Sequence, residues 1–144
     1  MRFAGREGGL LALEAFSLDV HLGEVVCIVG ASGCGKSTFL NIVAGFLAPT
    51  AGQVLLHEEP IRGVEPRCGM IFQDYALFPW MTVLDNIAFG PRLKGVSKRE
   101  RLERAAHWIR VVGLEGFEQA YPGSLSGGMQ QRVALSRALA NEPE

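Results

Sequence analysis

Residues 30–37 of the sequence, GASGCGKS, match the pattern G-x-x-x-x-G-K-[ST] and are called the phosphate loop below. Glycines in such a loop let successive backbone N–H groups converge on a phosphate, because no Cβ stands in the way. The lysine would reach the β- and γ-phosphates, and the serine hydroxyl would help to hold Mg²⁺. The pattern therefore predicts a nucleoside triphosphate site. Its candidate residues are Gly30, Ser32, Gly33, Cys34, Gly35, Lys36 (also a candidate catalytic residue), Ser37 (also a candidate metal ligand) and Thr38.

A second cluster of small residues, LSGGMQQR, occupies residues 125–132 and precedes a helical pattern. A serine hydroxyl, two amides without side chains and the positive end of a helix dipole would all point the same way there. These features predict a second anion-binding site. Its candidate residues are Ser126, Gly127 and Gly128.

The phosphate loop needs a strand before it and a helix after it, and the flanking sequence predicts both. Residues 25–29 form a continuous, largely β-branched apolar run, which is typical of a strand buried on both faces of a parallel sheet. Residues 16–22 alternate apolar and polar side chains, which predicts a half-buried strand. Apolar residues at helical spacing predict a helix over 37–46.

The middle of the chain predicts short elements separated by a polar loop. Short strands are expected at 54–56 and 69–72. A short helix is expected over 82–89, with Thr82 as its N-cap and Asp85 at the N3 position.

The last third of the chain predicts two longer helices. The first covers 97–112, with Ser97 as its N-cap and an i, i+4 ion pair between Glu100 and Arg104. The final helix covers 127–140, beginning at residue 127 or 128 and followed by a proline.

Composition narrows the class of protein. The chain has 144 residues, is 48% apolar and includes 18 glycines, more than the usual share of about 7%. Its longest strictly apolar run, residues 25–29, is far shorter than the roughly 20 residues that span a bilayer. A net charge of −1 gives no argument for nucleic acid. Three cysteines, none in a C-x-x-C pair, and no visible secretory signal favour reduced thiols in a cytosolic protein.

Residues 125–132 resemble the signature L-S-G-G-x-x-Q-R of the ATP-binding subunits of ABC transporters, with every fixed position matched. We call them the signature segment, and the resemblance extends over essentially the whole chain. It implies an α/β P-loop NTPase fold, with a RecA-like core, a small antiparallel β subdomain and a helical signature subdomain. It also implies a division into residues 1–81, the nucleotide-binding core, and residues 82–144, part of the helical subdomain.

The resemblance implies roles for residues that carry no pattern of their own. Gln73 looks like the glutamine that contacts Mg²⁺ or the attacking water in that family and links the nucleotide to the membrane partner. The signature segment would contact the ATP held by the other subunit of a homodimer. Phe3 is either the aromatic residue that stacks on adenine or an ordinary N-terminal aromatic side chain.

Residues 72–83 and 85–90 are similar to the branch that imports nitrate, sulfonates, taurine and similar solutes, although polyamine, iron and sugar importers share much of this stretch. Within it, residues 77–80, LFPW, form an apolar loop tip. Such a tip either docks on a permease, as the resemblance implies, or packs into the local core.

The resemblance also implies what residues 1–144 lack. After the run RALANEP at 137–143, the family continues into an apolar strand that carries the Mg²⁺-holding aspartate and the catalytic glutamate. We therefore expect a chain that is incomplete at its C-terminus, with a start that is also clipped, and that is poorly folded and inactive in hydrolysis on its own.

The function implied by the resemblance is that of an ATPase subunit, using ATP and Mg²⁺, that energises import of a small solute. Its partners would be a second copy, transmembrane permease subunits and, indirectly, a solute-binding protein, with no nucleic acid. Its place would be the cytoplasmic face of the inner (plasma) membrane, as a peripheral subunit. The alternatives are a soluble ABC ATPase without a permease and a non-catalytic nucleotide-binding fragment.

Overall fold

The structure is a computed structural model that describes residues 2–3, 10–11, 13–14 and 16–144. It divides into two compact units, Met1–Glu65 and Pro66–Glu144, and each is described by itself. The division expected from the sequence puts residues 66–81 with the first part, whereas their contacts lie within the second unit. The functional division at residue 81 stays a prediction.

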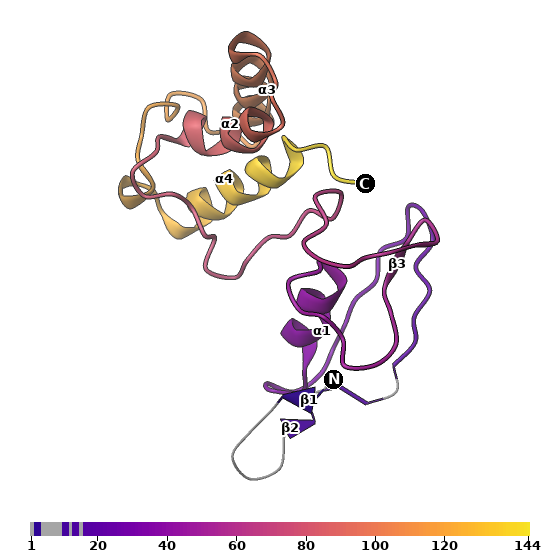
Figure 1. The fold of residues 1–144 in the computed structure, drawn as a ribbon. Coiled ribbons are helices and arrows are strands. Elements are labelled where there is room, and N and C mark those ends of the chain that lie inside the picture. Colours follow the sequence, from indigo (N-terminus) through magenta and orange to yellow (C-terminus); the bar gives the residue numbers. More distant parts are fainter. Residues whose placement is uncertain (1, 4–9, 12, 15) are drawn as a thin grey trace. The chain divides into compact units, whose positions relative to one another are not determined.

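Among its described residues, the first unit contains one helix and two small antiparallel sheets. Figure 1 labels α1, β1, β2 and β3. Helix α1 follows the phosphate loop, as the sequence predicts, but ends earlier than expected. His57 and Glu58 join β3 to β4 with φ values of 49° and 66°, the left-handed conformation that tight hairpins use. The elements are β1 (Arg2–Phe3), β2 (Leu10–Leu11), α1 (Lys36–Val43), β3 (Leu55–Leu56) and β4 (Glu59–Pro60).

The strands expected before the phosphate loop are not formed. Residues 16–22 and 25–29 have no strand partner among the residues described, and Val25 and Val29 are 89% and 92% exposed. A strand exists only where a neighbour completes its ladder of hydrogen bonds, and the apolar pattern cannot supply that neighbour. The strand expected at 69–72 is absent for the same reason, while β3 lies within the strand expected at 54–56.

The second unit is a packed group of helices, α2 (Val83–Leu93), α3 (Lys98–Val111) and α4 (Gly127–Leu139), with a 3₁₀ turn η1 (Pro122–Ser124) before α4. Figure 1 shows the three α-helices packed together, and each contacts the other two. Their shared core consists of Val83, Ile87, Ala88, Ala105, Ile109, Leu114, Leu125, Val133 and Ala140.

Side-chain caps fix where these three helices begin. Each begins directly after a hydroxyl residue that accepts a hydrogen bond from the N3 backbone N–H, which satisfies one of the unpaired donors of the first turn. The predicted caps of α2 and α3 are confirmed. The bonds are Asp85 N–H to Thr82, Glu100 N–H to Ser97 and Met129 N–H to Ser126, at 3.1, 3.3 and 3.3 Å.

Helix α2 runs past its predicted end at residue 89 to Leu93, with Pro91 inside it. A proline inside a helix lacks the N–H donor, and its ring crowds the carbonyl four residues before it. Pro91 is nevertheless accommodated, and it is buried in the unit. Its carbonyl still accepts the N–H of Val96, and the Gly90 carbonyl accepts that of Lys94, so the chain stays helical up to this point.

Ionic contacts fasten the C-terminal end of α4 to the other helices. Arg104 on α3 forms the predicted pair with Glu100 at 2.7 Å and reaches Glu142 at 2.8 Å. The hydrogen bond with Glu100, followed by the charge of Glu142, raises the pKa of the Arg104 guanidinium. Lys94, just after α2, donates to the Asn141 carbonyl at 2.6 Å. Both cations lie where the helix dipole of α4 is negative.

Candidate functional site

The phosphate loop turns into α1 through residues in the left-handed conformation. Gly33 and Gly35 have φ values of 80° and 99°, which any residue with a Cβ adopts only with strain. Gly35 is also the N-cap of α1 and provides no side-chain cap, so the first-turn N–H groups, from Lys36 to Thr38, stay open to an outside acceptor. This is the backbone arrangement that binds a phosphate.

Lys36 places its ammonium over the loop. Its Nζ donates to the carbonyls of Gly30 and Ala31, at 2.7 and 2.8 Å, and lies 3.7 Å from the Cys34 Sγ. The loop is closely packed here, since a Cβ on Gly30 would come within 2.7 Å of that sulfur. The positive charge of Lys36 and the helix N-terminus are thus gathered in one short segment, which also carries the exposed Ser32 and Ser37.

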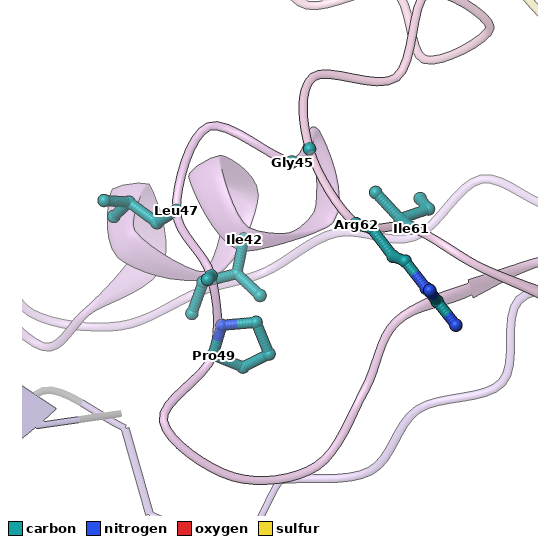
Figure 2. Close-up of a pocket in the computed structure, with 8 residues that line it drawn as sticks. Ile42, Gly45, Leu47, Pro49, Ile61 and Arg62 are labelled. Atoms are coloured by element: carbon teal, nitrogen blue, oxygen red, sulfur yellow. The ribbon is translucent and has the colours of Figure 1, made fainter.

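The opposite end of α1 borders a small hollow, shown in Figure 2, where Ile42, Gly45, Leu47, Pro49, Ile61 and Arg62 surround it. Its volume is about 60 Å³, enough for about two water molecules. A nucleotide needs several times that space. The hollow is therefore a packing feature, and the phosphate loop remains the candidate site of this unit.

The signature segment presents a second open helix start. Ser126, Gly127 and Gly128 are exposed, and a Cβ on Gly128 would meet nothing within 4 Å. The Ser126 hydroxyl binds the Met129 N–H, which leaves the two glycine amides of the first turn facing outward. The helix dipole adds about half a positive charge there. An anion can therefore approach this backbone closely.

The rest of the signature segment fastens it to the helical unit. Leu125 is buried, and Gln130 Nε2 donates to the carbonyls of Pro122 and Leu125 at 3.0 and 3.3 Å. Arg132 Nη1 donates to the Val112 carbonyl at 2.8 Å, just past the C-terminal end of α3. The exposed glycines of the signature segment are thus attached to a well-anchored part of the helical unit.

Gln73 is exposed at the start of a short loop, residues 73–78, which we call the Gln73 loop. Tyr75 and Ala76 within it have φ values of 59° and 47°, a left-handed conformation that costs such residues about 1–3 kcal/mol and persists only where the surroundings impose it. Arg137 on α4 donates to both of their carbonyls, at 3.2 and 2.7 Å. The Tyr75 hydroxyl lies 3.6 Å from where a Cβ on Gly127 would be.

Asn86 holds the end of the Gln73 loop on α2. Its side chain is fully buried and accepts the N–H of Phe78 at 2.9 Å. Its Nδ2 donates to the carbonyls of Phe78, Met81 and Thr82, at 3.0–3.1 Å. The Phe78 and Thr82 carbonyls also accept the backbone N–H groups of Met81 and Asn86, so the Asn86 side chain adds to bonds that the turn already makes.

The predicted site residues fall into two groups. The structure brings residues 30–38 together in the first unit. It brings the Gln73 loop and the start of the signature segment together in the second. Phe3 lies in β1 opposite Leu10, and its side chain lies outside the described residues, so its stacking role stays a prediction. Sequence reasoning assigned no role to Arg137, because nothing local marks it.

A comparison with family profiles decides the class of protein. The profile of the ABC transporter family matches residues 13–144, nearly the whole chain. The chain belongs to the ABC transporter family. Its relatives include an uncharacterised ABC transporter ATP-binding protein of Methanocaldococcus jannaschii, 53% identical over 92% of this chain and 50% of the relative.

Two further ABC relatives have named solutes. The nitrate import ATP-binding protein of Synechocystis is 47% identical over 99% of this chain and 53% of its own length. The taurine import ATP-binding protein of Roseobacter denitrificans is 50% identical over the whole chain and 54% of its own length. The chain thus spans about half the length of the curated ABC relatives it matches.

Solved ABC structures confirm the predicted fold class. A dimeric ATP-binding cassette in a post-hydrolysis state with ADP and Pi is 36% identical and superimposes with a TM-score of 0.86, over 99% of this chain and 67% of that chain. The dimeric structure of a bacterial ABC transporter cassette gives the same values. The expected α/β P-loop NTPase class holds, including its small antiparallel sheet, although the strands before the phosphate loop are not formed.

Replacing Gly35 with alanine should damage phosphate binding beyond its effect on stability. The left-handed φ of 99° would cost alanine about 1–2 kcal/mol and shift the N–H groups that follow. We expect pyrophosphate affinity, measured by calorimetry, to fall at least tenfold. Gly52→Ala is the matched control, since Gly52 is left-handed in the same unit but outside the loop. Equal affinity losses in both variants would contradict the assignment.

Proposed function

We propose that this protein is the ATP-binding, ATP-hydrolysing subunit of an ABC importer for a small solute such as nitrate, a sulfonate or taurine. The observation that carries the proposal is a pair of helix starts left open for anions, at the phosphate loop and at the signature segment. Similarity to nitrate and taurine import proteins supports the solute class. The same similarity favours an importer over a soluble ABC ATPase without a permease.

ATP is the proposed substrate of the phosphate loop. The open first turn of α1 and the Lys36 ammonium above it suit a chain of phosphates. Magnesium ion, when bound, neutralises charge on the β- and γ-phosphates. The exposed hydroxyl of Ser37, in the first turn, is a fitting oxygen ligand for it. The proposed ATP-binding residues are Gly30, Ser32, Gly33, Cys34, Gly35, Lys36, Ser37 and Thr38, with Phe3 against adenine.

The signature segment is proposed to contact the ATP held by a second copy of the protein. Ser126, Gly127 and Gly128 are exposed and need an anion from outside their own unit. The dimeric state of similar cassettes supports an assembly of two subunits. Each ATP would then touch both subunits, so that binding closes the dimer.

Gln73 is proposed to contact Mg²⁺ or the attacking water, since its amide offers both an oxygen acceptor and N–H donors. Its exposure and the firm anchoring of its loop suit that role. The sequence of residues 1–144 contains no apolar strand followed by the aspartate and glutamate that the family uses for hydrolysis. We therefore propose that these residues alone do not complete the reaction.

The tip at residues 77–80 is proposed to dock on transmembrane permease subunits. Trp80 is 70% exposed, whereas Leu77 packs against the helical core. A large exposed aromatic ring supported by a fixed neighbour suits a protein contact. The protein would then lie at the cytoplasmic face of the plasma membrane, with a solute-binding protein as an indirect partner and no nucleic acid. In the part of the chain described, no helix is both long and apolar enough to cross a bilayer.

Lys36→Ala should abolish most nucleotide binding. The change removes a side-chain charge that lies over the phosphate loop. We expect affinity for a fluorescent ATP analogue to fall at least tenfold. Lys98→Ala, which removes an exposed lysine at the start of α3, should leave that affinity unchanged. Equal binding by the wild type and Lys36→Ala would contradict the proposed function.

Residues 1–144 should show no steady ATP turnover in a phosphate-release assay, because their sequence contains no apolar strand followed by the aspartate and glutamate that the family uses for hydrolysis. The informative control is Lys36→Ala in the same fragment. Turnover that this substitution abolishes would show that the fragment is itself an ATPase and would refute this part of the proposal.

Trp80→Ser should weaken docking on the transmembrane subunits of the same transporter. Loss of a large exposed aromatic contact should lower that affinity at least tenfold, measured with the subunits in nanodiscs. ATP affinity should not change. Val111→Ser, which removes an exposed apolar side chain from the end of α3, serves as the control. Undiminished docking by Trp80→Ser would argue against this surface.

A further inference from the structure

Arg137 is a half-buried arginine near the end of α4, and it faces the Gln73 loop. Its two terminal nitrogens divide between two successive carbonyls. Nη1 donates to Ala76 at 2.7 Å, and Nη2 donates to Tyr75 at 3.2 Å. The guanidinium also lies 5.5 Å from the centre of the Phe78 ring, a cation–π distance. One side chain of α4 thus contacts three of the six residues of the loop.

In the part of the chain that the structure describes, the positive charge of Arg137 is balanced by backbone carbonyl dipoles and not by a carboxylate. Within the described residues, Arg137 forms no ion pair with a carboxylate, whereas Arg104 on α3 pairs with two. Burial lowers the pKa of the Arg137 guanidinium. Burying a cation is costly unless its N–H groups donate hydrogen bonds. The planar guanidinium carries donors on both terminal nitrogens, which fits two neighbouring carbonyls.

The carbonyls that Arg137 binds belong to the two left-handed residues of the loop. Tyr75 and Ala76 both have a Cβ, and no sequence preference selects positive φ for either. Such a turn persists only where its surroundings over-determine it. The hydrogen bonds of Arg137 act directly on these two peptide groups, and those of Asn86 act further along, at Phe78.

The same loop also lies beside the opposite end of α4. The Tyr75 hydroxyl lies beside Gly127, 3.6 Å from the position of a Cβ there. The Gln73 loop therefore rests on α4 at two places, one at the start of the helix and one near its end.

We propose that Arg137 is a positioning residue that fixes the Tyr75–Ala76 turn on α4 and so sets Gln73 relative to the open glycines of the signature segment. The inference rests on the proposed function only in taking Gln73 and the signature segment as ATP contacts. Arg137 itself touches no nucleotide. It acts through the backbone of the loop.

The test compares the wild type with Arg137→Met and Arg137→Lys, and Arg104→Met is the matched control. Hydrogen exchange should become at least tenfold faster at the amides of Tyr75 and Ala76 in Arg137→Met, and stay unchanged in the cores of α3 and α4. Affinity for the fluorescent ATP analogue should stay within twofold of the wild type. Arg137→Lys should lie between, because an ammonium lacks the planar fork.

Three results would overturn the inference. These are loop exchange in Arg137→Met like the wild type, exchange that rises evenly through all three helices, or the same loop effect in Arg104→Met. Should Arg137→Met fail to fold, Arg137→Lys decides by the same measurements. Failure of the proposed function is distinguishable, because it would show as undiminished ATP binding by Lys36→Ala and would leave the loop exchange result standing.

Discussion

Unpaired backbone N–H groups at the start of a helix are the constraint on which this structure depends. Every helix has them, and most proteins cover them with a side chain or water. Here α1 begins after Gly35, which offers no side-chain cap, and α4 begins after Ser126, whose hydroxyl covers only the Met129 N–H. In both places the donors left over are next to glycines, so an anion can come close. Glycine is frequent in this chain partly because these two helix starts require it.

The helices were predictable because their boundaries are set by neighbours in the sequence. Thr82 and Ser97 cap donors three residues away, and the structure places both caps where the pattern puts them. Strands are different, since the pattern of residues 25–29 indicates burial but says nothing of which segment pairs with them. The described residues supply no such segment, and the run is exposed. Local capping chemistry fixed where α2 and α3 start, although not where α1 and α2 end, whereas a strand depends on a partner that can be far away in sequence.

The candidate site also contains features that follow from neighbouring residues and features that depend on distant ones. The phosphate loop and signature segment could be identified from sequence because each works through consecutive backbone groups. Gln73 could be placed only by resemblance, since a lone glutamine carries no pattern. The side chain that anchors its loop could not be predicted from the sequence, because Arg137 lies 61 and 62 residues from the carbonyls it binds. The left-handed conformation of Tyr75 and Ala76 could not be predicted from the sequence either, because a positive φ is expected mainly at glycine.

Helix α4 gives the second unit its internal geometry. Gly127 and Arg137 are separated by about 15 Å along the axis, at 1.5 Å per residue. Helical side chains lean toward the N-terminus, so the guanidinium reaches back along the helix toward the signature segment. Tyr75 spans the remaining distance, with its carbonyl at Arg137 and its hydroxyl at Gly127. A helix bends little over three turns, and the loop is hydrogen-bonded to this helix at Arg137 and lies beside it at Gly127. If Arg137 positions the loop as proposed, a displacement of α4 would carry the Tyr75–Ala76 turn with it, and Gln73 lies two residues before that turn.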